Sequence, residues 1–210
     1  MRILVTAGPT REPIDSVRFI TNASSGRMGC AVASAAVEAG HDVTLLLGPC
    51  PAEPPAGCEV LRFMTAAELK RLLEEHFPAC DALVMAAAVG DFTPERPAVG
   101  KLRRSSGPVE LRLLPTDDLL AGVAAGKRPG QRIVAFAVEA GDEDAMSAAA
   151  RRKLTAKGAD FIVVNSPEAM SAETSRAAIL TADDVLLPWG ERTKTELAAE
   201  IVKLPATGGN

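Results

Sequence analysis

The chain of 210 residues is poor in aromatic residues, cysteine and histidine, and has no long apolar run. Four cysteines without a CxxC spacing and two isolated histidines argue against a disulfide scaffold or a zinc site. Six Phe, one Trp and no Tyr, with a net charge of −4, are a poor basis for nucleic-acid binding. The longest apolar run, residues 82–89, is far shorter than the ~18 residues of a membrane helix, and no secretion signal precedes it. We therefore expect a cytoplasmic protein that binds neither nucleic acid nor a membrane.

What is present is an alternation of short β-branched runs with longer stretches rich in Ala, Leu and Glu. This pattern and the length predict one α/β domain over residues 1–210, with a doubly wound, mostly parallel, Rossmann-like sheet. The predicted strands are Ile3–Thr6, Asp42–Leu47, Glu59–Phe63, Ala82–Ala87, Val109–Leu113, Arg132–Ala137 and Asp160–Val164. The predicted helices are Ser25–Ala39, Ala66–His76, Asp117–Ala125, Glu143–Lys157 and a last one from Lys194.

The last part of the chain follows a different pattern. Ala177–Thr181 and Val185–Trp189 flank an Ala-Asp-Asp turn, which predicts a β-hairpin at about residues 176–189, as an extension at the sheet edge. Residues 206–210 are expected to fray.

Two loops are longer than a minimal βαβ unit needs. Residues 7–24 separate the first strand from the first helix, where about 2–6 residues are usual, and residues 90–108 form a second long stretch. Because ligands of α/β folds bind at the carboxyl ends of parallel strands, these loops are the candidate site.

The first loop favours binding of an anion but leaves its identity open. Ser24-Ser25-Gly26 would open the first helix, so that the positive end of the helix dipole would face a phosphate or carboxylate. A dinucleotide-dependent oxidoreductase is one alternative, but the G-x-G-x-x-G turn and an acid after the second strand are absent, as is a P-loop. A nucleotide-binding module without catalysis is another, and the glycines could serve helix packing alone.

Motifs along the chain resemble a known family. Val5–Asp15, Val17–Asn22 and Ser24–Gly29 are similar to the opening of phosphopantothenoylcysteine synthetase, the CTP-dependent phosphopantothenate–cysteine ligase of coenzyme A biosynthesis. The likeness continues, in family order, through Met85–Phe92, Lys101, Phe136-Ala137, Arg152–Leu154, Lys157-Gly158 and Asp160. It covers about residues 3–204.

The resemblance implies a reaction that needs no enzyme nucleophile. The carboxylate of 4′-phosphopantothenate is activated on the α-phosphate of CTP with release of pyrophosphate, and the amine of L-cysteine then displaces CMP. It also implies Mg²⁺ and a homodimer. Since Met1 directly precedes the first strand, we expect a stand-alone synthetase or a domain cut from a fusion, without flavin. An association with a separate flavin-dependent decarboxylase is one arrangement the resemblance allows.

The resemblance also implies residue roles. Asn22 would contact the acyl-cytidylate as a catalytic and substrate-binding residue, and Lys101, on a flap over residues 90–108 that reaches across the dimer interface, would neutralise the pyrophosphate. Arg18 and Ala88 would bind substrate. The implied nucleotide-binding residues are Gly8, Ser24, Gly26, Ala87, Asp91, Phe136, Lys153 and Lys157, with Asp91 also toward Mg²⁺. Structural alternatives are a salt bridge for Arg18, a turn for Asn22 or Asp91, and a solvated basic face for the two lysines.

The chain departs from the family pattern in places. Phe136–Ala140 reads FAVEA where an FAAET-like run is usual, Gly90 replaces an alanine, and Leu102–Arg104 replaces an IKK-like run. These differences leave the choice between CTP and ATP open.

Overall fold

The computed structural model describes residues 1–104, 107–167 and 174–206. Its centre is an eight-stranded sheet in the order β12-β11-β10-β9-β6-β1-β4-β5. The six neighbouring strands β10-β9-β6-β1-β4-β5 pair in parallel. Strands β11 and β12 form an antiparallel hairpin beside β10. The strands are β1 Arg2–Ala7, β4 Asp42–Leu47, β5 Glu59–Arg62, β6 Ala82–Met85, β9 Arg132–Val138, β10 Phe161–Asn165, β11 Thr174–Leu180 and β12 Val185–Thr193. The predicted α/β fold and its hairpin extension are confirmed.

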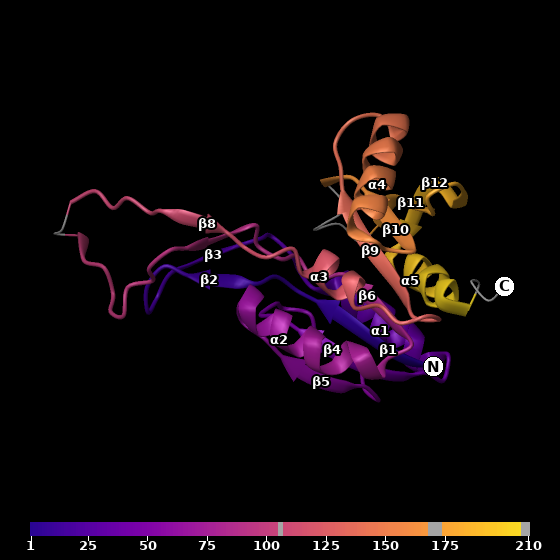
Figure 1. Cartoon of the computed structure of the whole chain (residues 1–210), viewed down its shortest axis with the longest axis horizontal. Helices are drawn as coiled ribbons and strands as arrows, with labels where there is room; N and C mark the ends of the chain where they lie inside the picture. Colours follow the sequence, from indigo (N-terminus) through magenta and orange to yellow (C-terminus); the bar gives the residue numbers. More distant parts are fainter. Residues whose placement is uncertain (105–106, 168–173, 207–210) are drawn as a thin grey trace.

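Helices cover both faces of this sheet, as the alternating strand pattern requires. Along β1, Ile3 and Val5 pack toward one face with α1 and α5, while Leu4 packs toward the other with α2, α3 and α4 (Figure 1). The helices are α1 Arg27–Glu38, α2 Ala66–His76, α3 Leu119–Ala125, α4 Glu143–Lys157 and α5 Lys194–Lys203, with short 3₁₀ turns at Phe77–Ala79 and Leu204–Ala206. Two apolar cores therefore sandwich a central sheet.

The strand order reverses direction next to β1. The chain passes from β1 through α1 to β4 and β5 on one side, and then through α2 to β6 on the other side of β1. In open α/β sheets this reversal leaves a crevice at the carboxyl ends of the two strands. The crevice here is expected between the ends of β1 and β6, where both long loops begin.

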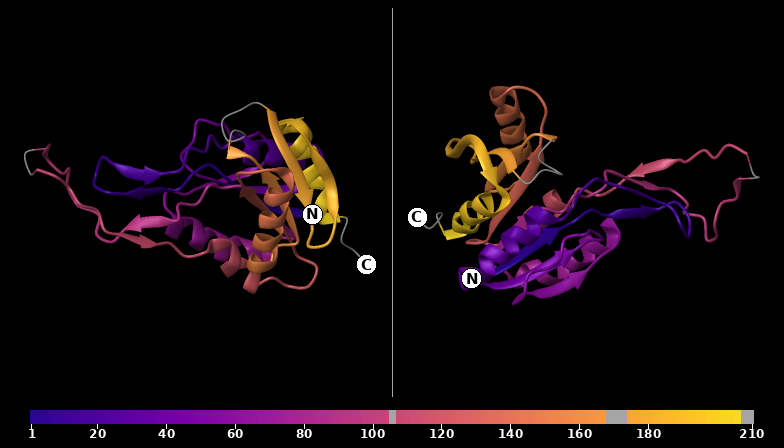
Figure 2. Two further views of the ribbon diagram at one scale, coloured as in Figure 1. Left: turned by 90° about the horizontal axis from the view of Figure 1, so that it is seen from above. Right: turned by 180° about the vertical axis from the view of Figure 1, so that it is seen from behind.

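Those two loops form a projection that the sequence did not predict in this shape. The first loop contains a hairpin of two strands, β2 Arg11–Pro13 and β3 Phe19–Thr21. The second loop continues to residue 116, and we call residues 90–116 the arm. In the arm, strand β7, Phe92–Pro94, pairs with β8, Leu113–Pro115. Figures 1 and 2 show both extending away from the sheet, side by side.

The predicted strand Val109–Leu113 is therefore wrong as a member of the main sheet. Its apolar and charged residues alternate, but the segment lies on the arm, and only Leu113 belongs to a strand, β8. Val109 and Leu111 are exposed. An extended segment that is exposed on both faces can thus show the same alternation as a strand that the core covers on one face. The expected fraying of residues 206–210 lies, apart from Ala206, outside the described residues.

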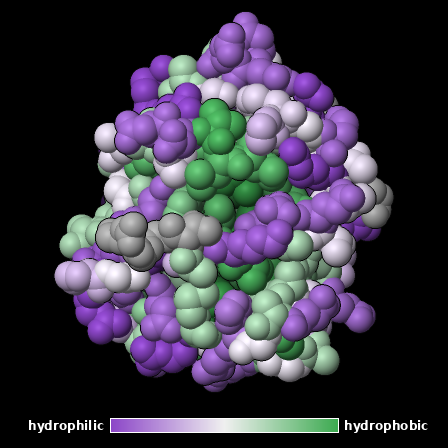
Figure 3. All heavy atoms as spheres, turned by 90° about the vertical axis from the view of Figure 1, so that its right-hand side faces the viewer, coloured by the Kyte–Doolittle hydropathy of each residue, from purple (hydrophilic) through white to green (hydrophobic). Residues whose placement is uncertain are grey.

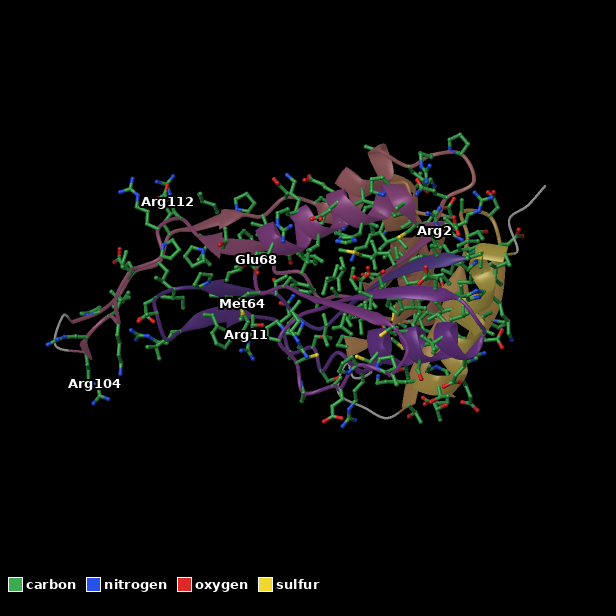
Figure 4. The ribbon with its side chains drawn as sticks, turned by 90° about the horizontal axis from the view of Figure 1, so that it is seen from below. Arg2, Arg11, Met64, Glu68, Arg104 and Arg112 are labelled. Atoms are coloured by element: carbon green, nitrogen blue, oxygen red, sulfur yellow. The ribbon has the colours of Figure 1, made fainter. Side chains whose placement is uncertain are left out.

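The hairpin of the first loop is fastened to the start of α2. Arg11 donates its backbone N–H to the carbonyl of Met64 at 2.7 Å, and the Glu68 carboxylate accepts from the Met64 N–H at 2.6 Å. Figure 4 labels these three residues, which lie next to one another. The buried Glu12 carboxylate accepts from the N–H of Ala66 at 2.9 Å. The base of the projection is thus tied to the body by backbone and carboxylate contacts.

Apolar side chains also reach the surface at the other end of the molecule. Seen from the end opposite the arm, they gather in the middle of the face and hydrophilic residues surround them (Figure 3).

Within the described ranges of the chain, no helix has both the length and the apolar composition needed to cross a membrane.

Candidate active site

A cavity of about 500 Å³ lies at the carboxyl ends of the central strands, where the strand order reverses. Its wall is made of the start of α1, the loop after β6, the ends of β9 and β10, and one face of α4. The predicted site residues on this wall are Asn22, Ser24, Gly26, Ala87, Ala88, Asp91, Phe136, Lys153 and Lys157. Residues far apart in the sequence therefore meet in one place.

The amino end of α1 is open toward this cavity. Gly26, at the N-cap, has φ +75°, and no side-chain hydrogen bond caps the helix. A Cβ at Gly26 would lie 2.3 Å from Cys50 Sγ, so glycine is needed here for both conformation and space. Because the positive end of the helix dipole faces the cavity, an anion is stabilised there.

Two other glycines of the motif serve packing. A Cβ at Gly29 would lie 2.5 Å from Ala7 Cβ, so this glycine allows α1 to lie directly on β1. Gly8, with φ +81°, is buried against Gly48 and is not on the cavity wall, so its expected nucleotide contact stays a prediction. Its carbonyl instead accepts from the Ala88 N–H at 2.9 Å, which fixes the backbone of that wall.

Buried threonines hold the loop after β6, and the sequence reasoning missed them. Thr6 Oγ1 accepts from the Ala87 N–H and Thr10 Oγ1 from the Gly90 N–H, both at 2.9 Å. Both threonines are fully buried. A buried hydroxyl needs a hydrogen-bond partner, so threonines within an apolar segment of the sequence were the signal that could have found them.

Asn22 connects the two long loops at the cavity. Its side-chain Nδ2 donates to the carbonyl of Val89 at 3.0 Å, and the side chain remains exposed. Asp91 is exposed two residues further on, where the arm begins. The amide and the carboxylate thus lie on the same rim.

The two lysines of α4 reach the cavity from the opposite side of the sheet, each beside an acid. Lys153 Nζ lies 2.5 Å from Glu139 Oε1, and Lys157 Nζ lies 3.4 Å from Asp118 Oδ2. Lys157 also lines a neighbouring hollow of about 290 Å³ together with Phe136. The carboxylates hold the ammonium groups at the cavity wall and separate two like charges on one helix face.

Two cations on the wall, Arg27 and Lys194, were not among the predicted site residues. Lys194, the first residue of α5, lines the same cavity. Its position depends on how the last helix returns to the sheet, and no local pattern in the sequence indicates this.

Arg18 and Lys101 are not on the cavity wall. Both line a separate hollow of about 720 Å³ on the arm, together with Arg103 and Arg104. The Arg18 guanidinium pairs with the carboxylate of Asp15, so the structural alternative for Arg18 is present. Within one chain, the arm cations and the cavity are two distinct basic regions.

No group of three or more metal-ligating side chains occurs in the part of the chain that the structure describes. The exposed carboxylate of Asp91 is on the cavity wall. Mg²⁺ commonly uses one or two protein carboxylates together with substrate phosphates and water. This donor set fits Mg²⁺ brought by a nucleotide, not a resident metal cage.

Comparison with known proteins identifies the family. The family described as "DNA/pantothenate metabolism flavoprotein C-terminal domain" matches residues 1–207. The chain belongs to this family. The resemblance read from the motifs is confirmed at this level.

Similar curated proteins are about twice as long as the matched segment. A cysteine/cysteine sulfinic acid decarboxylase from an unknown prokaryotic organism is 41% identical, over 96% of this chain and 57% of that protein. The coenzyme A biosynthesis bifunctional protein CoaBC of Mycobacterium bovis is 43% identical, over 96% of this chain and 51% of that protein. The chain thus spans about half the length of the curated relatives it matches.

Solved structures agree with the fold. The crystal structure of the C-terminal domain of CoaBC is 34% identical, with a TM-score of 0.79 over 97% of this chain and 94% of that one. The DNA/pantothenate metabolism flavoprotein from Streptococcus pneumoniae is 25% identical, with a TM-score of 0.86 over the full length of both chains. A Cab2 mutant in complex with phosphopantothenate-cysteine shares the fold at 17% identity, with a TM-score of 0.79 over 98% of this chain and 86% of that one.

Proposed function

We propose that this chain joins 4′-phosphopantothenate and L-cysteine, using CTP, as a phosphopantothenate–cysteine ligase of coenzyme A biosynthesis. The observation that carries the proposal is the convergence of the family's motifs on one cavity at the switch point of the sheet. Relatives named for coenzyme A biosynthesis, and a solved relative of their C-terminal domain, support it.

The proposed reaction needs positioning and charge, and the cavity offers both. The phosphopantothenate carboxylate attacks the α-phosphorus of CTP, forming an acyl-cytidylate and releasing pyrophosphate. The cysteine amine then attacks the acyl carbon, and CMP leaves with the electron pair of the broken C–O bond. The start of α1, with Ser24 and Gly26, receives phosphate, and Lys153 and Lys157 balance its charge.

Asn22 is assigned to the acyl group. Its amide can donate a hydrogen bond to an acyl or phosphate oxygen without the repulsion that a carboxylate would cause. Ala87 and Ala88 leave the backbone of the loop after β6 open to close approach, and the Phe136 backbone would read the cytosine edge. Asp91 would hold a Mg²⁺ ion that neutralises phosphate charge.

We further propose a homodimer in which the arm of one copy carries Lys101 to the cavity of the other. The hairpin and the arm expose a group of large apolar residues: Val17, Phe19, Phe92, Val99, Val109, Leu111, Leu113 and Leu114. Exposed apolar side chains gathered on one projection are typical of a protein contact. Contact through this surface would also account for a lysine that lies outside the cavity of its own chain.

The proposal extends to setting. We place the protein in the cytoplasm and expect no flavin in this segment. A flavin-dependent decarboxylase would exchange a substrate or product with it. The CoaBC relative is about twice as long as the matched segment. The decarboxylase could therefore be part of the same chain or a separate protein.

The decisive experiment measures pyrophosphate release with Mg²⁺, phosphopantothenate and cysteine, comparing CTP with ATP and omitting each substrate in turn. We expect release that requires phosphopantothenate and prefers CTP. Preference for ATP would keep the ligase and remove the cytosine assignment. Absence of release from folded protein that still binds nucleotide would favour a non-catalytic module, and binding of a nicotinamide cofactor would favour an oxidoreductase.

A further inference from the structure

The buried carboxylate of Asp15 collects donors from two separate segments. Its Oδ1 accepts from the N–H groups of Val17 and Arg18, both at 2.8 Å, and closes the turn between β2 and β3. Its Oδ2 accepts from Arg18 Nε at 3.0 Å and from Arg18 Nη2, and also from the Leu102 N–H at 3.0 Å. The side chain has no exposed surface. Leu102 belongs to the arm, 87 residues away in the sequence.

Arg18 holds the other side of the same arm residue. Its Nη2 donates to the Leu102 carbonyl at 2.8 Å, so both polar groups of the Leu102 backbone are bound by this pair. A second link, from the Ala98 N–H to the Ile14 carbonyl at 2.9 Å, joins the same two segments. The neighbouring residue, Lys101, is exposed. A buried carboxylate and a guanidinium therefore bind the arm at the residue next to this lysine.

We propose that Asp15 and Arg18 form a clamp on Leu102 that fixes the position of Lys101, which makes Asp15 a positioning residue for the ligase reaction. The proposal rests on the proposed function, because Lys101 matters only if it meets a phosphate. A side chain that must reach a leaving group needs a fixed origin, since displacement by about 1 Å can reduce a rate by 10²-fold. The Arg18 guanidinium holds the pKa of Asp15 well below its usual range, so the carboxylate remains ionised in any neutral buffer.

Asp15→Asn separates the two functions of this carboxylate. The Asn Oδ1 can still accept from the Val17 and Arg18 N–H groups and keep the turn, but its NH₂ group cannot accept from Arg18 or Leu102. The matched control is Asp81→Asn. Asp81 likewise accepts from a backbone N–H and from a guanidinium, both of Arg2. Figure 4 shows Arg2 at the end of the molecule away from Arg104 on the arm.

Two readouts test the clamp. Trypsin cleavage after Arg103 or Arg104 should be at least about fivefold faster in Asp15→Asn than in wild type and unchanged in Asp81→Asn. The kcat of product formation should fall by about 10- to 100-fold, close to the value for Lys101→Ala, while the KM for nucleotide stays within about twofold. A merely structural role of Asp15 would lower the melting temperature without this kcat effect.

Each outcome decides a separate question. Faster cleavage with unchanged kcat would show a clamp that positions nothing and would overturn the proposal, as would unchanged cleavage. If wild type has no ligase activity, the proposed function fails, whereas the cleavage rates still decide whether the clamp exists. If Asp15→Asn does not fold, amide exchange in the wild type replaces it: exchange of the Leu102 N–H at the rate of an unstructured peptide would overturn the clamp.

Discussion

The cavity and the arm are built in opposite ways. The cavity wall is backbone held by the central sheet and by buried hydroxyls, as where Thr6 and Thr10 bind the loop after β6. The arm leaves the body, exposes apolar side chains and is joined to the neighbouring hairpin by a few polar contacts around Asp15. Rigid elements thus position the groups that we propose bind the nucleotide, while a separately held segment carries the cation proposed to meet the leaving group.

The largest expected effect is in the cavity, at Asn22. Asn22→Asp removes the amide donor at nearly constant volume and adds a negative charge beside an anionic intermediate. Conversion of the acyl-cytidylate should slow by about 10²- to 10³-fold, the range for loss of one donor at a reacting oxygen. Thermal unfolding should change little, because the hydrogen bond to the Val89 carbonyl that the variant loses is exposed to solvent. Single-turnover amide formation measures the slowing.

Asn165→Asp is the matched control for charge alone. Asn165 ends β10 on the same cavity wall and does not contact the loop after β6 by any hydrogen bond found in the described residues. A smaller effect there is expected. Equal slowing in both variants would mean that negative charge anywhere in the cavity accounts for the loss, and Asn22 would lose its assigned role.

A smaller effect concerns the lysines of α4. Lys157→Met should weaken CTP binding about tenfold, which corresponds to ~1.4 kcal/mol, because it removes one cation from the phosphate site. Asp118→Asn should instead strengthen binding about twofold, since it releases Lys157 from the carboxylate beside it. Isothermal titration calorimetry measures both.

Lys70→Met provides the comparison. It breaks a similar surface pair, with Asp117 at 2.6 Å, but Lys70 does not line the cavity. CTP binding should be unchanged. Weaker binding in Asp118→Asn than in wild type would show that the acid helps to orient Lys157 rather than competing for it.

The sequence predicted the body better than the projection. Strands such as Asp42–Leu47 and helices such as Ala66–His76 were predicted with the bounds that the structure has, because each is governed by local periodicity and burial. The stretch Val109–Leu113 was misassigned since an extended exposed arm and a half-covered strand give the same alternation. Periodicity does not say which layer covers a strand.

The candidate site shows the same division. Motif positions near strand ends, such as Asn22 and Asp91, were placed together because parallel strands end at one edge. Gly8 lies off the cavity wall and its nucleotide role stays a prediction, since a glycine required by backbone packing and one required by a ligand cannot be distinguished in sequence. Lys194 and the Asp15 clamp depend on contacts between distant segments, which no local pattern carries.

The smallest expected effect is a pH dependence that reports how Asp15 stabilises the arm. The pKa of Asp15 lies well below its ordinary value of 3.8 in the folded chain, chiefly because Arg18 hydrogen-bonds to the carboxylate. A depressed folded pKa gives stability that is present above the unfolded pKa and is lost as pH falls below it. The difference in unfolding free energy between wild type and Asp15→Asn should therefore be constant from pH 8 to 5 and shrink between pH 4 and 3. Urea titrations at each pH measure it, and a difference that stays constant down to pH 3 would show that Asp15 acts without its charge.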